Sequence, residues 1–191
     1  PGVLCPTKLS EHGAMCRALT YREERDMTCR LNAIVAVCDD WGIGLDGGMV
    51  VENREDMRHF VACTTGHAVL MGRRTLESFP GARPLRNRRN VVLTRDATFE
   101  REGVEVVHAI DEALLAVEDE GEAWVIGGGE VYRQLLPRCE RVVVTRNHCV
   151  RPCDTRFPDL DADPAWRVEE VREGGVTPEG VAFDFVTYVR A

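Results

Sequence analysis

From Leu31 onward, short apolar runs alternate with segments whose apolar residues recur at helical spacing. Leu31–Cys38 is a short run that is apolar except for Asn32, which is typical of a strand buried on both faces. The same reasoning predicts strands at 68–71, 91–94, 104–107, 124–126, 141–145, 166–171 and 181–189, and helices at 54–64, 75–78, 110–117 and 130–136. Strands that alternate with helices indicate an α/β fold with a parallel sheet at its centre.

The predicted architecture is a single α/β domain with a mostly parallel, twisted central sheet of about eight strands, flanked by about four helices. Gly-Gly and Pro-Glu-Gly turn signals join the last two strands, so these should form an antiparallel C-terminal edge. The first 30 residues are polar and lack an apolar period. We therefore interpret residues 1–30 as an N-terminal extension of unknown role and residues 31–191 as the domain.

Charge and composition exclude several classes of protein. A formal net charge of −8 disfavours nucleic acid and anionic membranes as partners, because both attract positive charge. No apolar run approaches the roughly 20 residues of a membrane span, and no segment near the start has the plan of a signal peptide. The eight cysteines include no C-x-x-C pair, so we expect reduced thiols and no metal site in a cytoplasmic protein.

Basic residues follow two neighbouring predicted strands. Arg73 and Arg74 stand where a strand gives way to a helix, and Arg95 follows Thr94 at the end of the next strand. Cations at a helix N-terminus are unfavourable unless an anion joins them, and ligands of open α/β sheets bind beyond the carboxyl ends of the strands. The two loops therefore favour the extra phosphate of NADP over NAD, although solvated surface arginines would give the same pattern.

A third loop, Gly127–Gly129, follows a predicted strand and opens a helix. Backbone N–H groups in such a loop can face a pyrophosphate at close range. The run is not G-x-G-x-x-G, and no acid follows about 20 residues later, so the ordinary dinucleotide-binding fold is disfavoured. A tight turn without a ligand is the alternative interpretation.

One acid lies beside the apolar stripe predicted for the first helix. Asp56 precedes Met57 and stands one turn before Phe60 and Val61. Burial raises the pKa of a carboxyl group and lets it hold or relay a proton near neutral pH. The alternative is a first-turn acid that interacts with the helix dipole, a role that the neighbouring Glu55 fits better.

Taken together, these residues resemble dihydrofolate reductase of the bacterial type. The similarity extends from Leu31 to Ala191, and the order and spacing of the matching stretches make it specific. These stretches are Ile34–Val37, Trp41–Gly44, Asp56–Phe60, Val69–Ser78, Pro84–Arg88, Val125–Tyr132 and Asp154–Asp159.

The resemblance implies NADPH-dependent reduction of 7,8-dihydrofolate to 5,6,7,8-tetrahydrofolate for one-carbon metabolism, by a monomer that antifolates inhibit. Asp56 would hydrogen-bond the amino-pyrimidine edge of the pteridine and assist protonation of N5, and the Thr145 hydroxyl would support it. Arg88 would pair with the α-carboxylate of the folate glutamate, a bidentate task suited to arginine. The remaining substrate contacts would be Ile34, Ala36 and Ile126 at the pteridine, and Phe60, Phe79 and Leu85 along the aminobenzoyl group.

The resemblance also implies the NADPH contacts. The 2′-phosphate would lie on Arg73, Thr94 and Arg95. The pyrophosphate would lie along Arg74, Thr75, Gly127, Gly128 and Gly129. Ile43 and Gly44 would begin the mobile loop over the nicotinamide, and the expected cofactor-binding set is completed by Ala36, Gly72, Glu130, Val131 and Tyr132.

One departure from the family pattern concerns the mobile loop. Val50 and Val51 stand where many members have a proline–tryptophan pair, and an apolar side chain excludes water but cannot donate a hydrogen bond. The resemblance therefore leaves open the route of the proton to N5 and the fit of antifolates.

Two other functions compete with dihydrofolate reduction. The rival enzyme is a reductase of the same fold that acts on a ribosylamino-pyrimidine in riboflavin synthesis. Arg88 weighs against it, because that substrate has no glutamate tail. A non-catalytic ligand-binding relative is disfavoured, because Asp56, Arg88 and every phosphate loop are retained.

Overall fold

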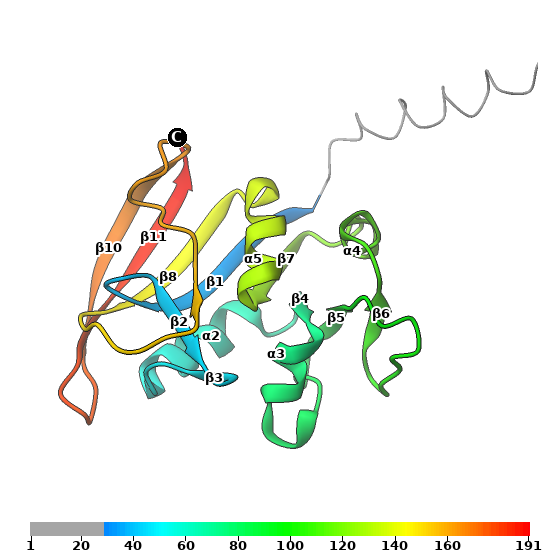
Figure 1. Cartoon of the computed structure of the whole chain (residues 1–191). Helices are drawn as coiled ribbons and strands as arrows, with labels where there is room; N and C mark the ends of the chain where they lie inside the picture. Colours follow the sequence, from blue (N-terminus) through cyan, green and yellow to red (C-terminus); the bar gives the residue numbers. More distant parts are fainter. Residues whose placement is uncertain (1–28) are drawn as a thin grey trace, which may run out of the picture.

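The fold is taken from a computed structural model that describes residues 29–191. Its main feature is an eight-stranded sheet with the strand order β10-β11-β8-β1-β7-β4-β5-β6 (Figure 1). The strands are β1 (Arg30–Cys38), β4 (Ala68–Gly72), β5 (Arg89–Leu93), β6 (Glu105–Val107), β7 (Glu122–Gly127), β8 (Arg141–Asn147), β10 (Trp166–Val176) and β11 (Ala182–Arg190).

The sheet is parallel at its centre and antiparallel at one edge. β1 pairs in parallel with β7 and β8, and the strands β7, β4, β5 and β6 continue the parallel arrangement. β11 pairs antiparallel with both β8 and β10. The predicted α/β sheet with an antiparallel C-terminal edge is confirmed.

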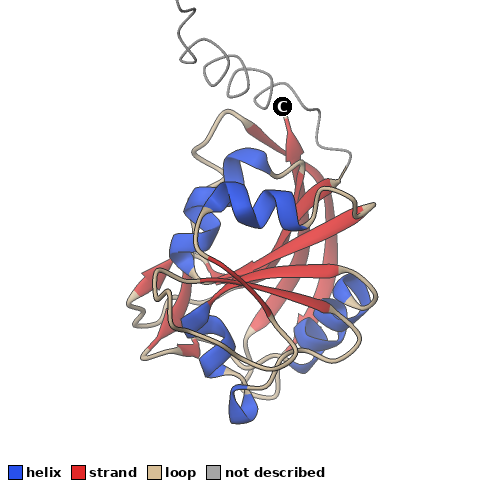
Figure 2. Cartoon of the chain, turned by 90° about the vertical axis from the view of Figure 1, so that its right-hand side faces the viewer, coloured by secondary structure: helices blue, strands red, loops and turns tan. Residues whose placement is uncertain are grey.

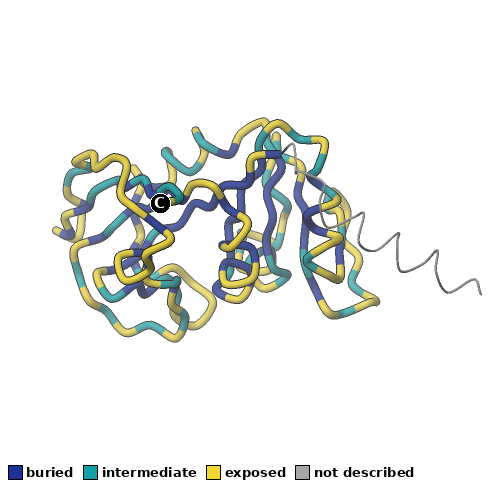
Figure 3. Tube along the Cα trace, turned by 90° about the horizontal axis from the view of Figure 1, so that it is seen from above, coloured by how far each residue is buried: buried dark blue, intermediate teal, exposed yellow. Residues whose placement is uncertain are grey.

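Helices cover both faces of the sheet (Figure 2). Successive strand residues point to opposite faces, so alternate residues of one strand enter two different cores. One core holds Leu31, Ala33 and Val35 together with α4 (Ile110–Ala116) and α5 (Gly129–Leu135). The other core holds Ile34, and side chains from α2 (Arg54–Thr64) and α3 (Arg73–Ser78) pack on it. These four helices of the described region agree with the predicted number, and the buried positions follow the strands (Figure 3).

A small second sheet was not predicted. It joins β2 (Gly42–Leu45) to β3 (Gly48–Met49) and β9 (Thr155–Arg156), within a region expected to be loop. The Asp46 N–H donates to the Asp154 carboxylate at 2.8 Å, and the Asp154 N–H donates to the Gly44 carbonyl at 3.0 Å. The loop after β1 is therefore held by a segment more than 100 residues later in the chain. Two short 3₁₀ turns, Pro80–Ala82 and Leu136–Arg138, complete the described elements.

The predicted extension, residues 1–30, lies outside the described residues except for its last two. Cys29 is buried in the first core and Arg30 opens β1, so the ordered domain includes both. Within residues 29–191 no helix is long and apolar enough to cross a membrane, and no three His, Cys, Asp or Glu side chains gather as a metal site. The six cysteines of this region are free thiols.

Candidate active site

Helix α2 presents polar residues to the sheet. Asn53 caps it by accepting the N–H groups of Glu55 and Asp56 at 3.0 and 3.2 Å, as its N-terminal position predicts. Asp56, Phe60 and Thr64 are spaced by four residues and share one face. Asp56 is 6 % exposed and Thr64 is fully buried.

The apolar stripe predicted for this helix was wrong in two of its three members. Met57 and Val61 are 48 % and 46 % exposed, whereas Phe60 is half-buried against the second core. The helix face that contacts the sheet contains Asp56, Phe60 and Thr64. It does not contain Met57 and Val61, contrary to what the apolar spacing indicated. The acid therefore lies inside the helix–sheet interface rather than at its border.

The environment of Asp56 favours its protonated form. Burial raises the pKa of its carboxyl, and the Thr145 hydroxyl opposes that rise. Thr145 lies on β8 next to Ala36 of β1, is fully buried, and its hydroxyl makes no hydrogen bond of standard geometry within the described chain. No cation of the described residues counters the burial of Asp56. An acid in this setting keeps its proton to a higher pH than an exposed acid does.

Five of the predicted substrate-contacting residues belong to one apolar cluster. Ile34 and Ile126 are buried members on β1 and β7, and Phe60, Phe79 and Leu85 pack against them half-buried. Ala36, two residues after Ile34 on the same strand, is half-buried. The structure thus brings the residues predicted at the pteridine and at the aminobenzoyl group onto the face of the sheet that α2 covers.

Arg88 has its guanidinium fixed by oxygen atoms but unpaired with any acid. Its Nε donates to the Thr64 hydroxyl at 2.8 Å, and its terminal nitrogens donate to the carbonyls of Arg86 at 2.8 Å and Val61 at 3.5 Å. It also lies over the Phe60 ring, with Cζ 5.7 Å from the centroid. No carboxylate of the described residues forms an ion pair with it. A half-buried, pre-positioned guanidinium of this kind suits an incoming carboxylate.

The neighbouring arginines differ from Arg88. Arg89 forms ion pairs with Glu105 at 2.7 Å and Glu120 at 3.2 Å, and Arg86 is exposed. Only Arg88 therefore combines partial burial, fixed geometry and an uncompensated charge. Arg88 is also the arginine of this loop that the family resemblance assigns to the folate glutamate.

At the carboxyl ends of β4 and β5 lie the arginines predicted at the 2′-phosphate. Arg73 pairs with Asp96 at 2.8 Å and with Glu77 at 3.4 Å. Arg74 and Arg95 are exposed and form no ion pair within salt-bridge distance in residues 29–191, although Arg95 helps to lower the pKa of Glu130. Helix α3 has only six residues, so the charges of the arginines matter more here than a helix dipole.

The glycine loop after β7 is shaped by close contacts. Gly127 has φ 108°, a conformation that favours glycine, and an added Cβ would lie 2.8 Å from the Tyr132 ring. The 127–128 peptide bond is cis. A Cβ on Gly128 would meet only the Thr75 hydroxyl, at 3.4 Å, so this backbone is uncovered apart from Thr75.

The three residues after the glycines have separate roles. Glu130 points outward and pairs with Arg133, whereas Val131 and Tyr132 are buried in the first core. The Tyr132 hydroxyl donates to the Ile34 carbonyl at 2.6 Å. Val131 and Tyr132 therefore lie in the core beside the glycine loop, and Tyr132 positions the strand that carries Ile34.

A family model of dihydrofolate reductase matches residues 30–190. Dihydrofolate reductase type 3 of Salmonella typhimurium is 38 % identical over 160 residues, which cover 84 % of this chain and 98 % of that protein. Dihydrofolate reductase of Mycobacterium tuberculosis (strain ATCC 25618 / H37Rv) is 40 % identical over 153 residues, covering 78 % and 91 %. The chain belongs to the dihydrofolate reductase family.

A solved structure of the same family extends the likeness to three dimensions. Dihydrofolate reductase from Enterococcus faecalis, complexed with NADP(H) and RAB-propyl, superposes with a TM-score of 0.78 at 32 % identity. The match covers 84 % of this chain and 96 % of that one. The fold therefore agrees with that of a dihydrofolate reductase that binds NADP(H).

Two residues at this dihydrofolate reductase site were not predicted from the sequence. Thr64 holds the Nε of Arg88, and Asp96 holds Arg73. The four-residue spacing of Asp56, Phe60 and Thr64 was a sequence signal that could have identified Thr64. Nothing in the sequence pattern indicated the second, because Asp96 is 23 residues from its partner.

Proposed function

We propose that this chain catalyses the NADPH-dependent reduction of 7,8-dihydrofolate to 5,6,7,8-tetrahydrofolate. The observation that carries the proposal is Asp56, a buried carboxyl on α2 with a raised pKa, next to an apolar wall and with no cation of residues 29–191 that counters its burial. A weakly basic, flat heterocycle with an amino-pyrimidine edge fits such an acid, because the edge donates hydrogen bonds and N5 accepts a proton.

At the substrate, Asp56 hydrogen-bonds the amino-pyrimidine edge and assists protonation of N5. Thr145 supports the carboxylate form through its hydroxyl, since that hydroxyl already opposes the rise in pKa. Ile34, Ala36 and Ile126 contact the pteridine, and Phe60, Phe79 and Leu85 contact the aminobenzoyl group. Arg88 pairs with the glutamate α-carboxylate. A ribosylamino-pyrimidine has no such carboxylate, which would leave the positioned Arg88 without a partner.

The residues around the glycine loop fit NADPH. Gly128 leaves backbone accessible next to Thr75, and three arginines lie at the carboxyl ends of the neighbouring strands. Arg73, Thr94 and Arg95 hold the 2′-phosphate, and Arg74, Thr75 and Gly127–Gly129 hold the pyrophosphate. Bound NADPH supplies the hydride.

The loop after β1 excludes water from the reacting atoms. Ile43 and Gly44 begin it on β2, and Val51 is buried at its far end. Val50 is tied to the rest of the chain through its carbonyl, which accepts from Arg151 at 3.4 Å. Val50 and Val51 exclude water without donating a hydrogen bond, so neither side chain passes a proton to N5, and Asp56 carries that role.

The decisive assay is the loss of NADPH absorbance with and without dihydrofolate. A loss that requires dihydrofolate supports the proposal. No loss with dihydrofolate, under conditions in which the protein is folded and binds NADPH, would contradict it.

We expect Arg95→Ala to raise the Michaelis constant for NADPH roughly tenfold and leave that for NADH nearly unchanged. Charge-assisted hydrogen bonds contribute about 1.5–3 kcal/mol, and an exposed arginine belongs at the low end. Arg101→Ala removes an exposed arginine from the same connection between β5 and β6 and is the matched control. Equal losses for both cofactors would contradict a 2′-phosphate contact at Arg95.

We also propose that residues 1–26 form an extension that reduction does not require. Cys29 is the first buried residue that the structure describes, and the family match begins at residue 30. A chain that begins at Met27 should unfold at the same temperature as the full chain and turn over dihydrofolate equally fast. Insolubility or loss of activity would assign residues 1–26 to the core or to an interface.

Finally, we propose that the enzyme is a cytoplasmic monomer that binds antifolates. All residues assigned to substrate and cofactor come from one chain, so the site needs no second copy. Light scattering on the purified chain tests the oligomeric state. Titration with a diaminopyrimidine tests antifolate binding.

A further inference from the structure

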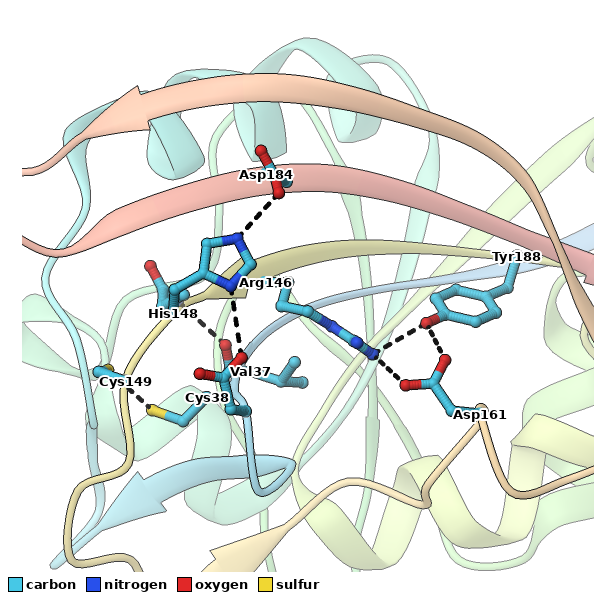
Figure 4. A network of polar contacts seen from close by, with 10 residues as sticks. Val37, Cys38, Arg146, His148, Cys149, Asp161, Asp184 and Tyr188 are labelled. Atoms are coloured by element: carbon cyan, nitrogen blue, oxygen red, sulfur yellow. Dashed lines mark hydrogen bonds and ion pairs between the residues drawn. The ribbon is translucent and has the colours of Figure 1, made fainter.

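Two cysteines outside the active site are in contact. Cys38 ends β1, and Cys149 follows β8 by two residues, yet their sulfur atoms are 3.7 Å apart (Figure 4). They are the only pair of cysteines in residues 29–191 with a sulfur–sulfur contact. Neither residue has a role in the proposed reaction.

The backbone holds these two sulfurs together. Next to the pair, the Asp39 N–H donates to the Cys149 carbonyl at 2.9 Å, and the Asn147 side-chain amide donates to the Val37 carbonyl at 3.2 Å. His148 lies 2.8 Å from Asp184, as Figure 4 shows, and 3.4 Å from Asp39. The chain ends of β1 and β8 are thus tied on both sides of the two thiols. A disulfide bond is about 2.05 Å long, so side-chain movement of less than about 2 Å would close it.

The two thiols differ in access. Cys38 is 1 % exposed, whereas Cys149 is half-buried next to Val150, which is 71 % exposed. The Arg151 guanidinium interacts electrostatically with both sulfurs. A small reagent therefore reaches Cys149 first, and Cys38 acts second.

We propose that Cys38 and Cys149 form a dithiol modification site that a low-molecular-weight disulfide, such as oxidised glutathione, converts to an intramolecular disulfide. The Cys149 thiolate attacks one sulfur of the reagent and releases one thiol. The Cys38 thiolate then attacks the Cys149 sulfur of the mixed disulfide and releases the second thiol. The two cysteine protons pass to the released thiolates, and the reagent gains the two electrons that the cysteines lose.

The second step is the slower one. Burial and the neighbouring Cys149 thiol raise the pKa of Cys38 to about 12, so little thiolate is present at neutral pH. The part of that rise due to the Cys149 thiol disappears once Cys149 carries the reagent. A transient adduct on Cys149 should therefore precede the cross-link.

The cross-link would join the end of β1 to the segment after β8, and both border the 39–51 loop. Cys38 is the residue before the 39–51 loop. The segment after Cys149 contacts this loop twice, through Arg151 to the Val50 carbonyl and through Asp154 to the Asp46 N–H. A Cys38–Cys149 disulfide would therefore link the start of the 39–51 loop to the segment that contacts this loop. It would also close a long stretch of chain between residues 38 and 149.

The test uses the reduced full chain. It is incubated with oxidised glutathione, free thiols are blocked with iodoacetamide at timed intervals, and peptides are mapped across all eight cysteines. The expected result is glutathione on Cys149 at early times, then a Cys38–Cys149 bond that dithiothreitol reverses. The cross-linked protein should unfold about 5–15 °C higher than the reduced protein.

Three variants make the outcome decisive. Cys38→Ser should stop at the glutathione adduct on Cys149, and Cys149→Ser should leave Cys38 reduced. Cys153→Ser, which removes a half-buried thiol four residues away, should cross-link like the wild type. A stable adduct on Cys149 in the wild type, a Cys149–Cys153 bond, or no modification of Cys149 would each overturn the proposal.

Discussion

Asp56→Asn is expected to lower the rate of hydride transfer near pH 7 by about 10²–10⁴-fold, the usual contribution of a positioned acid or base. The amide keeps the shape of the carboxyl but cannot hold or release the proton that N5 needs. The neighbours of Asp56 offer no substitute, because Thr145 is a hydroxyl and the rest of the wall is apolar.

The loss of rate in Asp56→Asn should become smaller as the pH falls. Burial raises the pKa of Asp56, so the carboxyl keeps its proton to a higher pH than an exposed acid does. The wild-type rate should therefore fall as the pH rises through that raised pKa. The variant should recover toward the wild-type rate at low pH, where N5 is protonated before the substrate binds.

Single-turnover kinetics across the pH range measure both effects. Glu55→Gln is the matched control, because Glu55 is the exposed neighbour on the same helix and pairs with Arg58. It should change the rate little at any pH. An Asp56→Asn rate within twofold of the wild type at pH 7 would remove Asp56 from proton delivery.

The central sheet was predictable because its strands carry their own signal. Runs such as Leu31–Cys38 are apolar except for Asn32, and a strand buried on both faces needs no partner to be recognised. The small sheet gave no such signal. β3 has two residues and β9 has two, and they pair with β2 only because Asp154 and its neighbours fold back on the 39–51 loop. Pairings of that length depend on tertiary contacts rather than local preference.

The candidate site was predictable to a similar degree. A lone acid beside apolar residues pointed to Asp56, yet the spacing of Met57, Phe60 and Val61 predicted the wrong contact face for α2. Met57 and Val61 on that helix are exposed whereas Asp56 and Thr64 are buried, which departs from the usual pattern of a surface helix. Such a departure is expected where a helix borders a binding site, because binding sites place polar residues where folding alone would favour apolar ones.

Arg88→Leu is expected to weaken folate binding by about 2–5 kcal/mol, or roughly 30-fold to several thousand-fold in the dissociation constant. Truncating one partner of a desolvated charged pair leaves the other charge without compensation, here the glutamate α-carboxylate. The structure sharpens this expectation. Arg88 is already fixed by Thr64 and by two carbonyls, so the binding carboxylate does not bear the cost of ordering a free side chain.

A pair of dissociation constants tests this, one for folate and one for a small diaminopyrimidine, in the wild type and in each variant. The diaminopyrimidine has no carboxylate, so its affinity for Arg88→Leu should barely change. Arg86→Leu removes an exposed cation from the same loop and should leave both affinities near the wild-type values. Arg88 also anchors α2 through Thr64, so loss of that anchor alone would disturb Asp56 and weaken both ligands together. Parallel losses would therefore make Arg88 a structural residue, whereas a loss confined to folate places the guanidinium on the glutamate tail.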